Sequence, residues 1–228
     1  MKKNNSKNAV VVCRMAAPRR LDNALVKSLD WPAGEEFIRI IFKAPAALAK
    51  LIPSTISSRY MVRLGCYSTG KGLRAPAKTP AAAGIEARPP ENFAEHMKVH
   101  KQARSFFMKT WGSRLTAGLK TSFGDFEKKN LAKTNSLIIF KKGKPAGIYS
   151  LFKMEQEGKP YDLVAWHNHL PGLTPAERRG AQGLAIAWLA KNAKRRLAVG
   201  LDGFDKVSLD FFSGLGFVVT RVGLTRLP

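Results

Sequence analysis

The spacing of apolar and polar residues predicts most of the regular structure after residue 90. A helical period, broken near Gly112, is followed by short runs in which apolar and polar residues alternate as they do in strands. The turn "KKGKP" joins the first two of these runs into an antiparallel hairpin. The expected elements, in chain order, are helices over 91–119, a hairpin over 135–153, a strand over 159–170, a helix over 181–196, a strand over 196–203, a short helix over 206–216 and a strand over 217–227.

The pattern is weaker before residue 90. It predicts strands over 35–43 and 58–68, with a short helix over 44–52 between them. Residues 70–90 are rich in glycine, proline and alanine, which is typical of a loop or linker. Residues 1–20 contain basic residues and no acid, and we expect this segment to be disordered.

This contrast predicts two regions. Residues 1–90 form a basic N-terminal region that is partly disordered or accessory, and residues 91–228 form a domain with the order αα–β–β–β–α–β–α–β. No apolar run approaches the length of about 20 residues that a membrane helix needs, so we expect no membrane span. Cys13 and Cys66 have no metal-ligand spacing, so we expect a reduced, cytoplasmic setting without a disulfide framework.

The chain is strongly basic. Lysine and arginine total 39 against 16 acidic residues, which is a formal net charge of +23. Basic residues are in excess both in residues 1–90 and after them, so the charge is not confined to a tail. Such a surface attracts polyanions, which makes RNA or the ribosome a candidate partner. A basic surface without a specific partner is the alternative.

The stretch "LTPAERRGAQGLAIAWLAKN" places two arginines and two glycines at the start of a helix. Thr174, Pro175 and Glu177 have the types and spacing of an N-cap, a first helical residue and a capping-box partner. A helix that begins there has Gly180 and Gly183 in its first turns, where each glycine costs about 1 kcal/mol relative to alanine. Either a ligand approaches the backbone at the glycines, or the helix begins later, near Ala181.

From residue 91 to the end, the chain resembles the GNAT superfamily of N-acyltransferases. The element order is similar, and the cofactor loop V-x-P-x-x-[QR]-x-x-[GA]-x-[GA] is matched at five positions by Leu173, Pro175, Arg178, Ala181 and Gly183. A second signature is approached by "DKVSLDFFSGLGF", residues 205–217. The resemblance implies an α/β fold with a GNAT-like mixed, largely antiparallel sheet flanked by helices, preceded by an N-terminal extension.

The resemblance also implies an acyl-CoA-dependent N-acyltransferase, with acetyl-CoA as the acyl donor and a primary amine as the acceptor. The donor's phosphates would bind at a helix N-terminus, where backbone N–H groups and the helix dipole favour anions. Small residues would allow the phosphates to approach, and arginines would add charge-assisted hydrogen bonds. The expected cofactor-binding residues are Leu173, Arg178, Arg179, Gly180, Ala181, Gln182, Gly183 and Phe211.

Catalysis requires a base for the amine. His167 and His169 alternate onto one face of the strand before the loop and have a suitable intrinsic pKa, although a pair of histidines that bond locally at a strand end is an equal alternative. Phe212 stands where the resemblance expects a tyrosine that protonates the thiolate, and core packing is its simplest interpretation. Asp162 and Glu157 are secondary candidates for the base, more often simply solvated.

No metal is expected. His96 and His100 have the i, i+4 spacing of helical metal ligands, but no further ligands accompany them, so a polar helix face is the interpretation we prefer. The acceptor amine remains open. The charge favours one carried by a polyanion, such as aminoacyl-tRNA or a ribosomal protein.

Two other functions compete with N-acetyl transfer. The first is a non-catalytic CoA- or nucleic-acid-binding protein that keeps the fold, for which Phe212 is the main argument. The second is a long-chain acyltransferase or an acyl-homoserine-lactone-synthase-like enzyme, in which residues 1–90 would add an acyl pocket.

Overall fold

The computed structural model describes residues 11–29, 31, 37–51, 56, 59–69, 73, 84–115, 117–156 and 158–226. The chain divides into two compact units: Met1–Tyr67 together with Gly200–Pro228, and Ser68–Val199. The boundary expected at residue 90 lies inside the second of these units. The division of roles between residues 1–90 and 91–228 stays a prediction.

The first unit is built from both ends of the chain. Its strands are β1 (Val11–Met15), β2 (Phe37–Ala47), β3 (Tyr60–Tyr67), β9 (Val218–Arg226) and the end of β8 (Arg196–Asp202). The order β1-β2-β9-β3 places the last strand of the chain between two early ones. β1 pairs with β2 in parallel, and β9 is antiparallel to both of its neighbours.

Two expectations for the first 67 residues were wrong. The segment predicted as a helix over 44–52 continues β2 to Ala47 and then forms the short 3₁₀ turn η1 (Leu48–Lys50). Pairing with β9 after a bulge outweighs the helical preference of its alanines. In the segment expected to be disordered, residues 1–10 lie outside the described residues, and Val11–Met15 form β1. The helix α1 (Asn23–Ser28), which Asp22 caps, follows.

The second unit carries most of the elements that the periodicity predicts. They are β4 (Ile85–Arg88), α2 (Phe93–Trp111), η2 (Gly112–Arg114), α3 (Ala117–Asn130), η3 (Leu131–Lys133), β5 (Asn135–Lys141), β6 (Lys144–Gln156), β7 (Lys159–His169) and α4 (Pro175–Asn192). The sheet order is β8-β7-β6-β5-β4, parallel between β7 and β8 and antiparallel elsewhere. One correction is β4, which lies in the segment predicted to be a loop.

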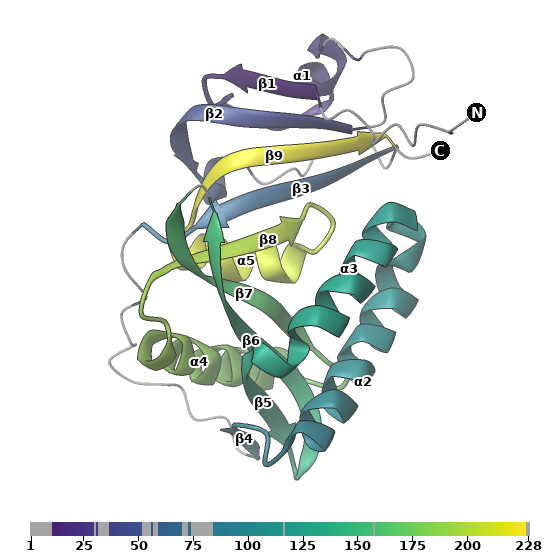
Figure 1. Ribbon diagram of the computed structural model, residues 1–228, viewed down its shortest axis with the longest axis vertical. Helices are drawn as coiled ribbons and strands as arrows, with labels where there is room; N and C mark the ends of the chain where they lie inside the picture. Colours follow the sequence, from purple (N-terminus) through teal and green to yellow (C-terminus); the bar gives the residue numbers. More distant parts are fainter. Residues whose placement is uncertain are drawn as a thin grey trace, which may run out of the picture. The chain divides into compact units, whose positions relative to one another are not determined.

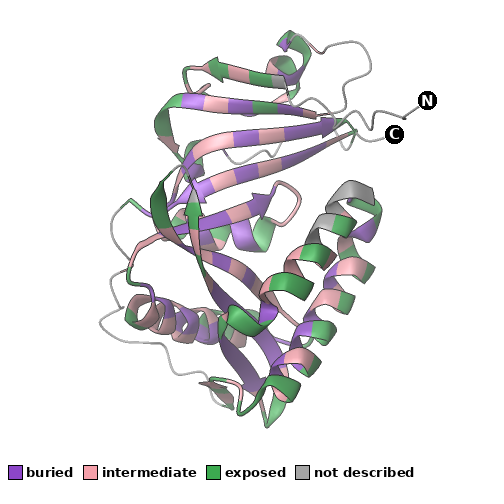
Figure 2. Ribbon diagram, in the orientation of Figure 1, coloured by how far each residue is buried: buried purple, intermediate pink, exposed green. Residues whose placement is uncertain are grey.

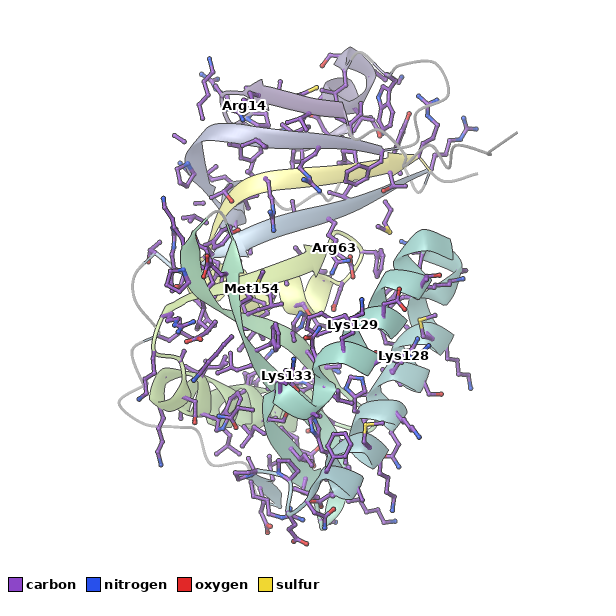
Figure 3. All side chains as sticks on the ribbon, in the orientation of Figure 1. Arg14, Arg63, Lys128, Lys129, Lys133 and Met154 are labelled. Carbon is purple, nitrogen blue, oxygen red and sulfur yellow. The ribbon has the colours of Figure 1, made fainter. Side chains whose placement is uncertain are left out.

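With α5 (Lys206–Gly214) and β9, the predicted order αα–β–β–β–α–β–α–β is confirmed. The mixed, largely antiparallel sheet with flanking helices is confirmed as well. The first helical segment breaks at Gly112, as expected. At the end of α3 and in η3, the side chains of Lys128, Lys129 and Lys133 are exposed (Figure 3).

Helices cover both faces of the second unit's sheet, with α2 and α3 on one side and α4 on the other (Figure 1). On the α2 side, the buried apolar residues are Val99, Ala103, Ile138, Phe140 and Ile148. On the α4 side, the Asn135 amide of β5 donates to the Asn192 side chain of α4 at 3.1 Å. The strands between the helices are mostly buried (Figure 2).

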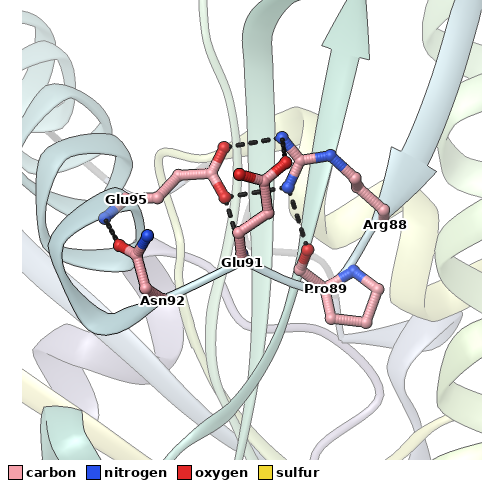
Figure 4. Close-up of polar contacts among 5 residues, drawn as sticks. All are labelled: Arg88, Pro89, Glu91, Asn92 and Glu95. Carbon is pink, nitrogen blue, oxygen red and sulfur yellow. Dashed lines mark hydrogen bonds and ion pairs between the residues drawn. The ribbon is translucent and has the colours of Figure 1, made fainter.

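The start of α2 is attached to β4 by a network of charged and polar groups (Figure 4). Arg88 donates to both carboxylate oxygens of Glu95, at 2.8 and 2.7 Å, and the Glu91 N–H donates to the same carboxylate. The Asn92 side chain caps the helix by accepting from the Glu95 N–H at 2.9 Å. The Arg88 guanidinium lowers the pKa of Glu95 to about 2, so this carboxylate stays charged at neutral pH.

Candidate functional site

A β-bulge in β7 determines which face of the sheet the two candidate histidines occupy. Leu151 of β6 pairs with Val164, and Ser150 pairs with Trp166, so Ala165 is an extra residue in β7. A bulge of one residue moves all following side chains to the opposite faces. Trp166 therefore packs against the α2 side, where its ring lies 4.8 Å from that of His100.

Beyond the bulge, His167 and His169 share the α4 side of the sheet. His167 pairs with Tyr149 of β6, and His169 pairs with Gly147. Without the extra residue, His167 would pair with Ile148, whose side chain belongs to the apolar core under α2. Two residues along a strand span about 7 Å, so the two imidazoles border one region of this face.

The ring of His169 is held in place by its neighbours on β6. His169 Nε2 lies 2.9 Å from the Tyr149 hydroxyl, which is buried. The ring passes over Gly147, where a Cβ atom would lie only 3.0 Å from His169 Cδ2. Glycine at position 147 therefore leaves the space that lets the imidazole reach the tyrosine.

The connection from β7 to α4 is ordered by Lys141 of β5. Lys141 Nζ donates to the Gly172 carbonyl at 2.7 Å and to Glu177 Oε2 at 2.8 Å. Glu177 and Thr174 form the predicted capping box, with bonds of 2.8 and 3.2 Å. The hydrogen bond from Lys141 is the main cause that lowers the pKa of Glu177 to about 2. The first turn of α4 therefore carries a fixed carboxylate.

The start of α4 is at Pro175, so the alternative start near Ala181 was wrong. The capping box and proline at the first position favour the earlier start more than the two glycines oppose it. The first bond of the helix runs from the Arg178 N–H to the Thr174 carbonyl at 2.9 Å. Gly180, Ala181 and Gly183 therefore lie in the second and third turns and are buried, where backbone N–H groups bond along the helix.

The predicted cofactor residues differ in exposure. Arg179 is exposed, Gln182 is half-buried and Leu173 is buried. Arg178 is half-buried, and its Nε atom is buried without a hydrogen-bond acceptor in the described part of the chain. Because buried guanidinium nitrogens are normally paired, this atom fits an acceptor that arrives with an anionic ligand, such as a phosphate oxygen.

The residues of the second signature lie in the first unit. Phe211 of α5 is half-buried. Phe212 is fully buried, with its ring centroid 5.0 Å from those of both Phe211 and Phe217. The interpretation of Phe212 as core packing is confirmed.

The remaining titratable candidates have structural roles or lie outside the described residues. Asp162 is buried and accepts from the N–H groups of Lys194 and Arg195 at 2.7 and 2.9 Å, so it joins the end of α4 to β7 and is not solvated as expected. Glu157 lies outside the described residues. His96 and His100 are buried, so the expected polar helix face was wrong.

The described residues contain neither a cluster of metal ligands nor a helix that could span a membrane. Among these residues, no group of three or more His, Cys, Asp or Glu side chains is arranged to hold a metal ion. Within the same part of the chain, no helix has the length and apolar character needed to cross a membrane.

Sequence reasoning missed three residues of this site: Gly147, Tyr149 and the bulge residue Ala165. Of these, only Gly147 had a local signal, because a glycine inside a strand pattern suggests a bulge or the close approach of another group. The roles of the other two depend on the register between β6 and β7, which a local pattern does not contain.

Comparison with known proteins concerns the fold. No protein-family model and no curated protein matches the chain. Among solved structures, a GCN5-related N-acetyltransferase from Kribbella flavida is 12% identical over 83% of this chain and 67% of its own, with a TM-score of 0.43. An acetyltransferase from Streptococcus agalactiae is 12% identical over 64% and 100%, with a TM-score of 0.42. A conserved protein of unknown function from Staphylococcus epidermidis is 11% identical over 85% and 74%, with a TM-score of 0.46. At these values, the assignment of function rests on the chain's own residues.

Proposed function

We propose that this chain is an acyl-CoA-dependent N-acyltransferase that transfers an acetyl group from acetyl-CoA to a primary amine. The observation that carries the proposal is the bulge at Ala165, which turns His167 and His169 to the side of the sheet on which α4 packs. The next element along the chain is α4, whose first turn ends at Arg178, and the buried Nε atom of this arginine has no hydrogen-bond acceptor among the described residues. A candidate base and a candidate anion site thus belong to one side of one unit.

Arg178 and Arg179 are the groups that would hold the donor's phosphates. Because the first turn of α4 is closed by its own capping box, the arginine side chains, rather than free backbone N–H groups, would supply most of the phosphate contacts. Gly180, Ala181 and Gly183 add no side-chain bulk beyond Cβ to this part of the helix. Leu173 and Gln182, in the same unit, complete this proposed donor-binding set.

The chemistry requires one proton transfer before bond formation and one after it. The acceptor arrives as an ammonium ion, and His167 or His169 takes its proton, which frees the nitrogen lone pair for attack on the thioester carbonyl carbon. The new C–N bond forms as the C–S bond breaks, and the sulfur leaves as a thiolate. The attacking nitrogen carries a positive charge again after it bonds to carbon, and it gives its second proton to water. Since Phe212 has no proton to give, this water protonates the thiolate, whose conjugate thiol has an ordinary pKa near 8.5.

The acceptor class follows from the charge. A net charge of +23 favours an amine carried by a polyanion, such as aminoacyl-tRNA or a ribosomal protein, because the same surface attracts the carrier. The experiment is to incubate the chain with acetyl-CoA and a panel of free amines, aminoacyl-tRNAs and ribosomal proteins, and to measure thiol release and acetylated product by mass spectrometry. Absence of product across the panel would count against catalysis.

Donor binding is tested separately with Arg178→Gln. A charge-assisted hydrogen bond contributes about 1.5–3 kcal/mol, so CoA affinity should fall about tenfold or more. Affinity for pantetheine, which has no phosphate, should not change. Lys191→Gln, an exposed position near the end of the same helix, is the matched control for lost charge. Equal CoA affinity of the Arg178 variant and the wild type in calorimetry would refute the phosphate role.

A non-catalytic CoA-binding protein is the second candidate, favoured by the complete burial of Phe212 at the position where the resemblance expects a proton donor. It predicts saturable CoA binding that depends on Arg178, without thiol release on any amine. The two experiments above therefore distinguish the candidates.

A further inference from the structure

One face of the first unit's sheet carries arginines from neighbouring strands. The opposite face is the apolar core, whose buried residues include Ile38, Ile40, Val62, Leu64, Val222 and Leu224. Alternation then places Arg14, Arg39, Arg63 and Arg221 together on the other face. We call these four arginines, with Phe37, the arginine face; Figure 3 labels Arg14 and Arg63.

The register staggers these charges. Arg39 of β2 and Arg63 of β3 flank Gly223 of β9. Arg221 lies two residues before Gly223 on β9. Arg221 pairs with Ile41 of β2, and Ile41 pairs on its other side with Arg14 of β1. Strands lie about 4.8 Å apart, so charges in one row are about 10 Å apart, and diagonal neighbours are about 7–8 Å apart.

Glycines allow the side chains of the arginine face to lie flat. A Cβ atom at Gly65 would lie 2.5 Å from Arg221 Cγ, and one at Gly200 would lie 3.2 Å from Arg63 Nε. A Cβ atom at Gly223 would lie 3.1 Å from Phe37 Cε2. The phenyl ring therefore lies over Gly223, between the strands that carry Arg39 and Arg63.

Among the described residues of this face, basic side chains outnumber acidic ones. Among the described strand residues that share it, Asp202 is the one acid, with Oδ1 3.9 Å from Arg63 Nε. Arg14 and Arg39 are exposed, while Arg221 and Phe37 are half-buried, so these groups are open to an anion from solution.

We propose that the arginine face binds single-stranded nucleic acid, with the guanidinium groups on phosphates and the Phe37 ring stacked on a base. A sheet face with an aromatic ring among cations suits unstacked bases, whose faces are open to stacking, and each arginine is a geometric match for phosphate oxygens. The Arg39 guanidinium carbon lies 5.9 Å from the Phe37 ring centroid, so charge and ring form one surface. This inference does not depend on acyl transfer.

The test uses the full chain and fluorescein-labelled oligouridine or oligothymidine of about 16 nucleotides, a length within known site sizes. Binding is followed by anisotropy at several salt concentrations. The triple variant Arg14→Gln/Arg39→Gln/Arg221→Gln should bind about tenfold or more weakly, and its log–log salt slope should fall in magnitude by about 2, or 0.7 for each lost phosphate contact. Tighter binding of oligouridine would indicate RNA as the ligand, and tighter binding of oligothymidine would indicate single-stranded DNA.

The matched control removes the same charge elsewhere. Lys128→Gln/Lys129→Gln/Lys133→Gln changes exposed residues of the second unit and should leave the slope nearly unchanged. Phe37→Leu should weaken binding without changing the slope, because stacking releases no counterions. The single variant Arg39→Gln, at an exposed position, provides the same test should the arginine triple unfold.

Three outcomes would overturn the proposal. Equal losses in the arginine and lysine triples would indicate charge attraction without a site. No binding of either oligonucleotide by the wild type at low salt would remove the ligand class. Binding to vesicles of anionic phospholipid, together with none to the oligonucleotides, would assign the face to membrane surfaces instead.

Discussion

At the scale of single residues, the candidate site depends on how His169 is held. Ala165 moves the imidazole to the α4 side, Gly147 leaves it space, and the Tyr149 hydroxyl contacts Nε2 at 2.9 Å. A hydrogen bond of this kind sets the tautomer and the orientation of a histidine, and both matter for a base. Tyr149 is therefore a positioning residue in the proposed reaction.

Tyr149→Phe tests this role. The variant keeps the ring and removes the hydroxyl, so the contact with His169 Nε2 is lost, and kcat should fall about tenfold while KM for acetyl-CoA changes little. A positioned base contributes about 10²–10⁴-fold, so His169→Ala should cost more. The pH–rate profile should also change in Tyr149→Phe and not in the control Tyr161→Phe. An unchanged kcat and profile would show that Tyr149 is only a packing residue.

Phe212→Tyr would restore the residue that the resemblance expects, but the structure argues against a gain. The ring is fully buried, so a hydroxyl there must find a partner or remain unsatisfied, at a cost of about 1–3 kcal/mol. The free energy of unfolding, measured by urea denaturation, should fall by that amount, with no increase in kcat. Phe211→Tyr, on a half-buried ring, should cost less. A stable and faster Phe212→Tyr enzyme would contradict this account.

The two cysteines should differ in reactivity. Burial raises the pKa of Cys66 to about 12, so its thiol stays protonated at neutral and mildly alkaline pH, whereas Cys13 is half-buried. Since the thiolate is the nucleophile, iodoacetamide near pH 8 should modify Cys13 in the native chain and leave Cys66 intact. Peptide mass spectrometry measures both sites, and the denatured chain, in which both should react, is the control. Rapid native labelling of Cys66 would contradict its burial.

At the scale of elements, α2 and α3 meet the sheet through a buried polar layer. His96 Nε2 lies 3.0 Å from Ser136 Oγ, which lies 2.8 Å from Ser150 Oγ. Next to it, His100 Nε2 lies 3.1 Å from Glu127 Oε1. Helix and strands are thus joined by groups that require partners, which makes their docking sensitive to charge.

This layer predicts a pH dependence. Burial, and then the neighbouring His100, lowers the pKa of His96 below its ordinary value of 6.5, so the folded chain binds this proton less readily than the unfolded chain. Stability should therefore be full above about pH 6.5 and fall as the pH drops through that value. His96→Gln, which cannot be protonated, should lose less stability than the wild type between about pH 7.5 and 5, measured by urea midpoints. Parallel losses in the two proteins would assign the dependence to other groups.

Elements with a strong local period could be predicted, and those that depend on distant partners could not. The hairpin β5–β6, the strand β7 and the break at Gly112 follow from alternation and turn residues. β1 and β4 are short, and their stability comes from pairing with β2 and β5, which lie far away in the sequence.

The site divides in the same way. Residue type and position are enough to predict His167, His169 and Arg178 as candidates. The Tyr149 contact, the bulge and the arginine face require the register between strands, which no single segment contains.

At the scale of the whole molecule, the chain's two ends build one unit. β9 lies between β2 and β3, so its fully buried side chains Val222 and Leu224 have cross-strand neighbours that belong to the first 67 residues on both sides. The expected domain of residues 91–228 would contain β9 without either neighbour. Burial of one apolar side chain contributes about 1.5–3 kcal/mol, and a strand with two open edges favours aggregation.

A truncated chain of residues 91–228 should therefore fail to fold as the full chain does. We expect loss of the cooperative thermal transition, or aggregation on heating, when circular dichroism and light scattering are compared with those of the full chain. Addition of a peptide covering residues 1–67 should restore part of the transition, because it returns both neighbours of β9. This complementation is the control that separates a missing partner from a damaged preparation. If residues 91–228 alone melt cooperatively at the temperature of the full chain, the boundary at residue 90 is correct, and the strands of the N-terminal region are accessory to a domain that is stable without them.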